Sequence, residues 1–98
     1  MAVLLELSIF SIEGEVSKRS EVASVILALQ KEGFSPILGE MGTVLETQEM
    51  SDALRAIEVA NSVMQAKRYY VIAKFDCYPQ REKMIEGRVE RVLKELRS

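Results

Sequence analysis

Residues 2–10 alternate in a way that commits this stretch to a strand with two different faces. The odd positions, from Val3 to Ile9, are all aliphatic, whereas Glu6 and Ser8 stand among the even positions. Side chains on a strand point alternately to opposite sides of a sheet, so the odd set predicts a core-facing side. The even set mixes apolar and polar groups, and we expect it to meet a ligand or another protein surface.

Three further runs predict strands. The second covers residues 37–41 after Pro36, the third is Thr43–Thr47 and the last covers residues 69–77. In the third run Leu45 faces one side of the sheet and Glu46 the other. A carboxylate in a central strand is costly unless it is solvated, paired or bound to a cation, so Glu46 is the first candidate for a site.

Apolar residues at helical spacing fill the gaps between these strands. Ser17 is an N-cap residue type, and the first helix is predicted to run from it to about Lys31, with Gly33 as C-terminal cap. The second helix is expected to open near Glu49 and to end near Arg68. The third is predicted over residues 82–96. The buried stripe of the second helix is expected to be Leu54, Ile57, Ala60 and Met64.

This order is βαββαβ with an additional C-terminal helix. It predicts the α+β, ferredoxin-like sandwich: an antiparallel sheet, the first and third strands in its middle, and two helices on one face. We expect residues 1–98 to form a single domain, since 98 residues is an ordinary size for one.

Composition excludes several classes of protein. The net charge of −2 argues against a nucleic-acid binder, and the absence of His removes the commonest general base and zinc ligand. Glu6 and Ser8 interrupt the first apolar run, so we expect neither a signal peptide nor a membrane span. The single Cys77 fits a reducing cytoplasm and is expected to be a small buried side chain.

One sheet face should remain without helices, and we call it the open face. Four of its side chains are carboxylates and one is a lysine, so it should attract a cation, with Phe10 and Tyr70 offering aromatic surface. It is also too apolar to stay bare, and a second copy is expected to cover it. Its members are Leu4, Glu6, Ser8, Phe10, Leu38, Glu40, Val44, Glu46, Tyr70, Ile72, Lys74 and Asp76.

Two hypotheses remain open at this point. The open face is either a small-molecule site or only a subunit interface of an interaction or regulatory module. An enzyme is disfavoured, because Ser8 lacks a base and Cys77 lacks an activating His. Carboxylates alone could hold a metal, but the spacing of a calcium loop is absent, so we expect no metal site and no resident cofactor.

Three segments resemble the small thiamine-binding proteins of the YkoF-like group. They are Leu5-Glu6-Leu7-Ser8-Ile9, Met41-Gly42-Thr43-Val44-Leu45-Glu46 and Lys74-Phe75-Asp76. The resemblance covers nearly the whole chain, and the Gly-Thr-Val-Leu-Glu run is its most specific part. The chain departs from the family pattern at Thr47, where a glycine is common.

The resemblance implies a ferredoxin-like homodimer or homotetramer built through the sheets. It also implies non-enzymatic binding of thiamine, or of its hydroxymethylpyrimidine half, between the sheet and a neighbouring subunit. The expected ligand-binding residues are Ser8, Phe10, Thr43, Glu46 and Asp76. Thiamine carries a cationic thiazolium and an aminopyrimidine, so Glu46 could accept from the exocyclic amine while Ser8 or Thr43 meets a ring nitrogen. Strand alternation places Thr43 opposite Glu46 unless Gly42 introduces a bulge.

Overall fold

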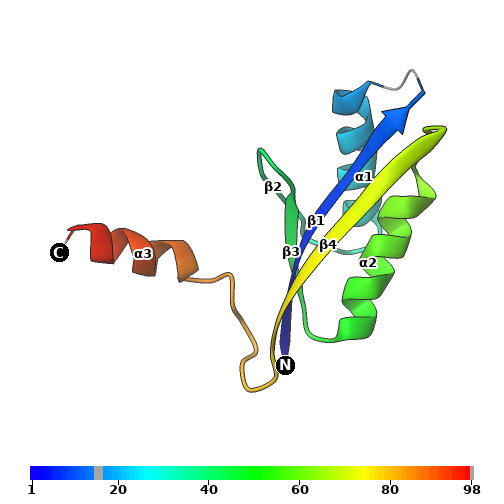
Figure 1. Ribbon diagram of the computed structural model, residues 1–98. Helices are drawn as coiled ribbons and strands as arrows, with labels where there is room; N and C mark the ends of the chain where they lie inside the picture. The colour runs from blue at the N-terminus through cyan, green and yellow to red at the C-terminus, as the bar shows by residue number, and fades with distance from the viewer. Residues whose placement is uncertain (15–16, 98) are drawn as a thin grey trace.

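The structure is a computed structural model that describes residues 1–14 and 17–97. Its strands and helices follow the predicted order (Figure 1). The elements are β1 (Ala2–Glu13), α1 (Lys18–Lys31), β2 (Ile37–Leu38), β3 (Thr43–Thr47), α2 (Met50–Ser62), β4 (Arg68–Tyr78) and α3 (Arg88–Arg97).

The sheet has the strand order β2-β3-β1-β4, and each pair of neighbouring strands is antiparallel. The helices α1 and α2 lie side by side against β1 and cover one face of the sheet (Figure 1). β1 and β3 are therefore central, and the predicted α+β, ferredoxin-like architecture with an additional C-terminal helix is confirmed.

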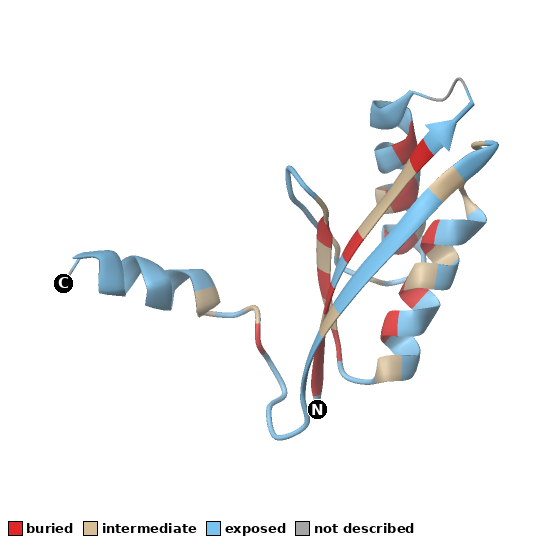
Figure 2. Ribbon diagram, viewed as in Figure 1, coloured by how far each residue is buried: buried red, intermediate tan, exposed pale blue. Residues whose placement is uncertain are grey.

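The core lies between the sheet and the two packed helices (Figure 2). Leu5, Leu7 and Leu45 face the helices and are at most 2% exposed, which confirms the predicted core side of β1 and β3. Val25 and Leu29 of α1 meet them. Burial of one such aliphatic side chain contributes about 1.5–3 kcal/mol, so these residues supply much of the driving force for folding.

Both predicted ends of α1 are confirmed. The Ser17 hydroxyl accepts a 3.3 Å hydrogen bond from the N–H of Ser20, which satisfies a donor that the first helical turn leaves free. Gly33 follows the last turn with φ of +91°, a conformation that a side chain would strain.

The prediction for β2 was too long. Only Ile37–Leu38 pair with β3, because the N–H of Gly39 donates to the carbonyl of Gly42 at 2.9 Å and closes a turn. β1, in contrast, continues to Glu13 instead of ending at residue 10. The sequence around Gly14 predicts a loop over residues 12–16, but Ile12 and Glu13 belong to β1. Residues 15 and 16 of that loop lie outside the described residues.

The predictions for α2 were wrong at its end and in one buried residue. The helix ends at Ser62, so Arg68 opens β4 instead of closing α2. Leu54 is 53% exposed, whereas Ile57 and Met64 pack against the core as expected. The small residues Ala53, Ala56 and Ala60 form the contact surface, which lets α2 approach the sheet closely.

Cys77 is exposed, so the expectation that it is buried was wrong. It belongs to the edge strand β4, of which only Tyr69 and Phe75 are partly buried among residues 68–78. The two helices cover the centre of the sheet and leave this edge open.

The third helix begins at Arg88, later than predicted, after an irregular segment over residues 79–87. It stands apart from the sheet and from the other helices (Figure 1), and none of its described residues is buried. Its apolar stripe of Val89, Val92, Leu93 and Leu96 is exposed. Within residues 1–14 and 17–97, no helix has the length and apolar character that crossing a membrane requires.

Candidate functional site

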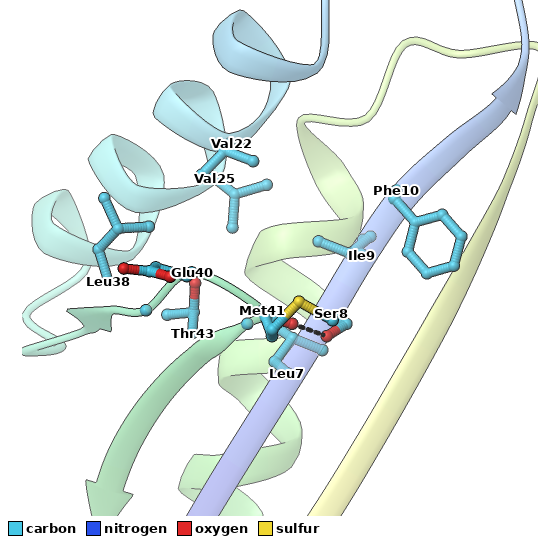
Figure 3. Close-up of a pocket in the computed structure, with 12 residues that line it drawn as sticks. Leu7, Ser8, Ile9, Phe10, Val22, Val25, Leu38, Glu40, Met41 and Thr43 are labelled. Atoms are coloured by element: carbon cyan, nitrogen blue, oxygen red, sulfur yellow. Dashed lines mark hydrogen bonds between the residues drawn. The ribbon is translucent and has the colours of Figure 1, made fainter.

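A pocket lies at the edge of the sheet where β3 stops and β1 continues (Figure 3). We call it the edge pocket. Its volume is about 190 Å³. The lining comes from residues 7–10 of β1, Val22 and Val25 of α1, and residues 38–43.

The register of the sheet creates this pocket. Pairing between β1 and β3 ends at Leu7 opposite Thr43, whereas β1 runs on to Glu13. The chain before Thr43 turns away at Gly39 instead of extending β3. The space that two further residues of β3 would fill is therefore left as a pocket under α1.

One hydrogen bond fixes the turn to the strand. The Oγ of Ser8 donates to the carbonyl oxygen of Met41 at 3.0 Å (Figure 3). A Cβ on Gly42 would lie 3.0 Å from this Oγ and 3.3 Å from the Leu7 carbonyl oxygen. Glycine at position 42 therefore permits the turn to approach β1 closely, without a bulge in the strand.

Polar groups in the edge pocket come from two faces of the sheet. Thr43 is 7% exposed and shares the helix side with Leu45, as alternation indicated. Ser8 lies on the open face, and Glu40 is an exposed carboxylate in the turn. Phe10 contacts Tyr70 edge to face, with ring centroids 5.8 Å apart. The pocket therefore combines apolar walls, two hydroxyls, one carboxylate and an aromatic ring.

A second hollow lies on the open face, and we call it the face pocket. Its volume is about 250 Å³, and its charged groups are paired. Lys74 lies 3.5 Å from Glu6, and Arg88 lies 3.2 Å from Asp76. Its lining residues are Leu4, Glu6, Val44, Lys74, Asp76 and Arg88.

Glu46 holds the segment that follows β4. Its Oε1 accepts a hydrogen bond from the N–H of Met84, a residue that is 1% exposed. The guanidinium of Arg88 also lies 3.8 Å from the Met84 sulfur. The carboxylates of Glu46 and Asp76 thus fasten residues 84–88 to the open face.

The structure divides the five predicted ligand-binding residues into two groups. Ser8, Phe10 and Thr43 line the edge pocket. Glu46 and Asp76 stand on either side of Leu4 in the sheet. Ser8 follows Leu4 by four residues, so the two groups are about 13 Å apart along β1 at 3.3 Å per residue. One ring cannot contact both groups.

Sequence reasoning missed several lining residues. Val22 was predicted only as part of the apolar spacing of the first helix, Val25 was not singled out, and Arg88 had no predicted contact with the sheet. Two of the four carboxylates predicted for the open face therefore pair with cations, Glu6 with Lys74 and Asp76 with Arg88. Only the tertiary structure could show the pairing of Arg88 with Asp76, since the two residues are 12 apart in the sequence and the chain between them is largely irregular.

Solved structures from several organisms have the same fold as this chain. A hypothetical protein from Methanocaldococcus jannaschii is 28% identical with a TM-score of 0.73, covering 97% of this chain and 95% of its own. A domain of unknown function from Bacillus cereus is 22% identical with a TM-score of 0.73, and the match covers 92% of this chain and 88% of that chain. A Thermotoga maritima protein, described provisionally as one of thiamine biosynthesis or salvage, is 18% identical with a TM-score of 0.77. The match covers 94% of this chain and 99% of that chain.

The search of curated proteins gave no match. The family described as thiamine-binding protein, however, matches residues 5–93, which include every residue that lines the edge pocket and all those that line the face pocket except Leu4. A match over this length is evidence of membership, and it agrees with the resemblance seen in the three sequence segments. The chain belongs to the thiamine-binding protein family.

Proposed function

We propose that the protein binds thiamine, or its hydroxymethylpyrimidine half, with the pyrimidine ring in the edge pocket. The observation that carries this proposal is that Ser8, Phe10 and Thr43 line one pocket of a chain that belongs to the thiamine-binding family. Binding leaves the ligand unchanged, because the Ser8 hydroxyl donates to a backbone carbonyl and not to a base that could activate it.

The size of the edge pocket selects the pyrimidine half. An apolar cavity of ~150 Å³ accommodates benzene. The edge pocket, at about 190 Å³, therefore suits one substituted six-membered ring and is too small for both rings of thiamine. The thiazolium ring then lies outside the pocket, near its rim.

The electrostatics of the rim fit a cation. Glu40 is exposed in the turn that closes the pocket. Phe10 of β1 stands opposite Tyr70 of β4 in the sheet, and their rings are in contact. A carboxylate and aromatic ring faces both favour a positive heteroaromatic group. We place the thiazolium over this rim.

Calorimetry with thiamine and its two halves tests the proposal. Thiamine and hydroxymethylpyrimidine should bind, while the thiazole half alone should not, because it lacks the ring that fills the pocket. Ligand at about 100-fold over its dissociation constant should also add roughly 2.7 kcal/mol of stability. Absence of binding by both thiamine and hydroxymethylpyrimidine would refute the proposed function.

A second copy is proposed to cover the open face, forming a homodimer or homotetramer. Ile72 is 55% exposed and Tyr70 49% exposed on this face, and the stripe of α3 is exposed as well. Together they form more apolar surface than a small chain usually leaves in water. If no thiamine-type ligand binds, these surfaces favour the alternative function, an interaction module built by self-association.

A further inference from the structure

The C-terminal helix α3 projects away from the rest of the molecule (Figure 1). The radius of gyration is 14.8 Å, whereas a compact chain of this length has one of about 12.6 Å. None of the described residues of α3 is buried, and the four side chains of its apolar stripe are 40–76% exposed. A separate helix of ten residues is only marginally stable in water, so α3 needs another surface to pack against.

The contacts at the first turn of α3 direct the helix away from its own open face. The guanidinium of Arg88 lies 3.2 Å from the Asp76 carboxylate of β4. The Gly87 carbonyl accepts a 3.0 Å hydrogen bond from the N–H of Arg91, so the helix begins directly at this anchor. No loop lies between the anchor and the helix in which the chain could reverse its direction. The surface that covers the stripe therefore comes from another molecule.

The open face has an apolar surface that residues 84–88 leave uncovered. We call it the uncovered strip, and its members are Phe10, Val44, Tyr70 and Ile72. Tyr70 and Ile72 are 49% and 55% exposed. Val44 stands opposite Glu6 in the sheet, and Tyr70 stands opposite Phe10. Glu6 and Phe10 are four residues apart on β1, so the strip is about 13 Å long at 3.3 Å per residue.

The apolar stripe of α3 matches the uncovered strip in length. Val89 and Leu96 are its first and last members. At 1.5 Å per residue they are about 10.5 Å apart along the helix axis, which fits within the length of the strip. A helix on this face would also mirror the other side of the sheet, which α1 and α2 already cover.

The charges of the two surfaces are complementary as well. The helix α3 carries four basic and two acidic side chains. The open face carries the carboxylates of Glu6, Glu46 and Asp76 against the single ammonium of Lys74. A basic helix is attracted to an acidic face, and the pair of Arg88 and Asp76 shows this attraction within one chain.

We propose that α3 of one copy lies on the uncovered strip of a second copy, while α3 of the second copy lies on the strip of the first. Such an exchange is reciprocal, so it closes into a two-fold dimer. Each helix buries its stripe, and each sheet gains a cover. The inference rests on the proposed covering of the open face by a second copy, and it names a helix, not the partner's sheet, as the covering element. It does not depend on thiamine binding.

Leu93→Glu tests the role of the helix. It should divide the oligomer into smaller species, because it would bury a carboxylate in the contact. The fold should survive, since α3 lies outside the core, and circular dichroism and urea unfolding check this. Leu54→Glu is the matched control on α2, at a position that is 53% exposed, and it should keep the native mass.

Light scattering at micromolar concentration separates the outcomes. A native mass in the Leu93→Glu protein would overturn the inference. If the Ile72→Glu protein still dissociates in that case, the sheet of a second copy covers the open face, and the proposed covering stands. A native protein that is already monomeric would overturn both.

Disulfide trapping identifies the contact directly. The exposed Cys77 is first replaced by Ser, and Ile72→Cys and Leu93→Cys are then introduced into separate copies. After the copies are mixed and exchange subunits, mild oxidation should link position 72 of one copy to position 93 of the other, as mass spectrometry of the peptides would show. The control pair of Leu54→Cys and Leu93→Cys should remain unlinked. Absence of the link between positions 72 and 93 would overturn the inference.

A membrane surface is the competing occupant for an exposed amphipathic helix. The stripe consists of two valines and two leucines and has no aromatic residue, which favours a protein surface over a lipid one. The native protein should therefore not sediment with vesicles of phosphatidylcholine and phosphatidylserine. Vesicle binding that Leu93→Glu abolishes without a change in mass would overturn the inference.

Discussion

The Oγ of Ser8 and the carbonyl oxygen of Met41 are joined by a 3.0 Å hydrogen bond across 33 residues of sequence. This bond holds the turn over residues 39–42 against β1, immediately before β3 begins at Thr43. The Ser8 side chain thus lines the edge pocket and also holds in place the turn that forms one of its walls. One wall of the pocket consequently depends on a contact that the hydroxyl of Ser8 makes.

Ser8→Ala should loosen this turn and weaken thiamine binding. A single neutral hydrogen bond contributes about 0.5–1.5 kcal/mol, so the dissociation constant should rise roughly two- to tenfold. Ser62→Ala is the matched control, since its Oγ also donates to a backbone carbonyl, at 2.6 Å, but on α2. Calorimetry on both variants decides the point, and equal affinities would show that the turn does not shape the site.

Glu46→Gln should leave thiamine affinity within about threefold, since this residue binds Met84 and lies about 13 Å from Ser8 along the strand. The amide still accepts from the Met84 N–H, although more weakly than the carboxylate. Exchange at the Met84 amide should therefore accelerate. A tenfold loss of thiamine affinity in the folded variant would instead return Glu46 to the ligand site.

Leu45→Ala should destabilise the fold by about 2–5 kcal/mol, because the side chain is 1% exposed in the core. Leu54→Ala provides the comparison at a position that is 53% exposed, and it should change stability by less than about 0.5 kcal/mol. Urea unfolding measures both free energies. Similar losses in the two variants would mean that α2 is rotated relative to the arrangement described above.

Ile72→Glu should divide the proposed oligomer into smaller species, because it buries a carboxylate in the covered open face. Light scattering at micromolar concentration measures the mass. Leu27→Glu, on α1 at a position that is 65% exposed, is the control and should keep the native mass. If only the Leu27 variant dissociates, the interface lies on the helices and not on the open face.

Cys77 should react readily with a thiol reagent in the native state, at a rate near that of the unfolded chain, because its side chain is exposed on β4. Labelling should leave thiamine affinity unchanged, since Cys77 does not line the edge pocket. Slow native labelling of the assembled protein would place Cys77 in a subunit interface.

Local patterns determined much of the fold. Alternation in β1 and β3 assigned Leu5, Leu7 and Leu45 to the core, and they are buried. Cap residues placed both ends of α1, because Ser17 and Gly33 act on the backbone within one turn. These features could be predicted since the physics that produces them involves residues close together in the chain.

The arrangement of the site was decided by tertiary structure. Alternation showed that Thr43 and Glu46 face opposite sides, but it could not show that pairing stops at Leu7 and opens a pocket there. Nor could it show that Glu46 and Asp76 hold residues 84–88. A register and a contact across more than 30 residues depend on how a whole segment packs, and no local period encodes that choice. The sequence by itself determined which side chains share a face, and the packing of the turn and of the segment after β4 decided which of them share a site.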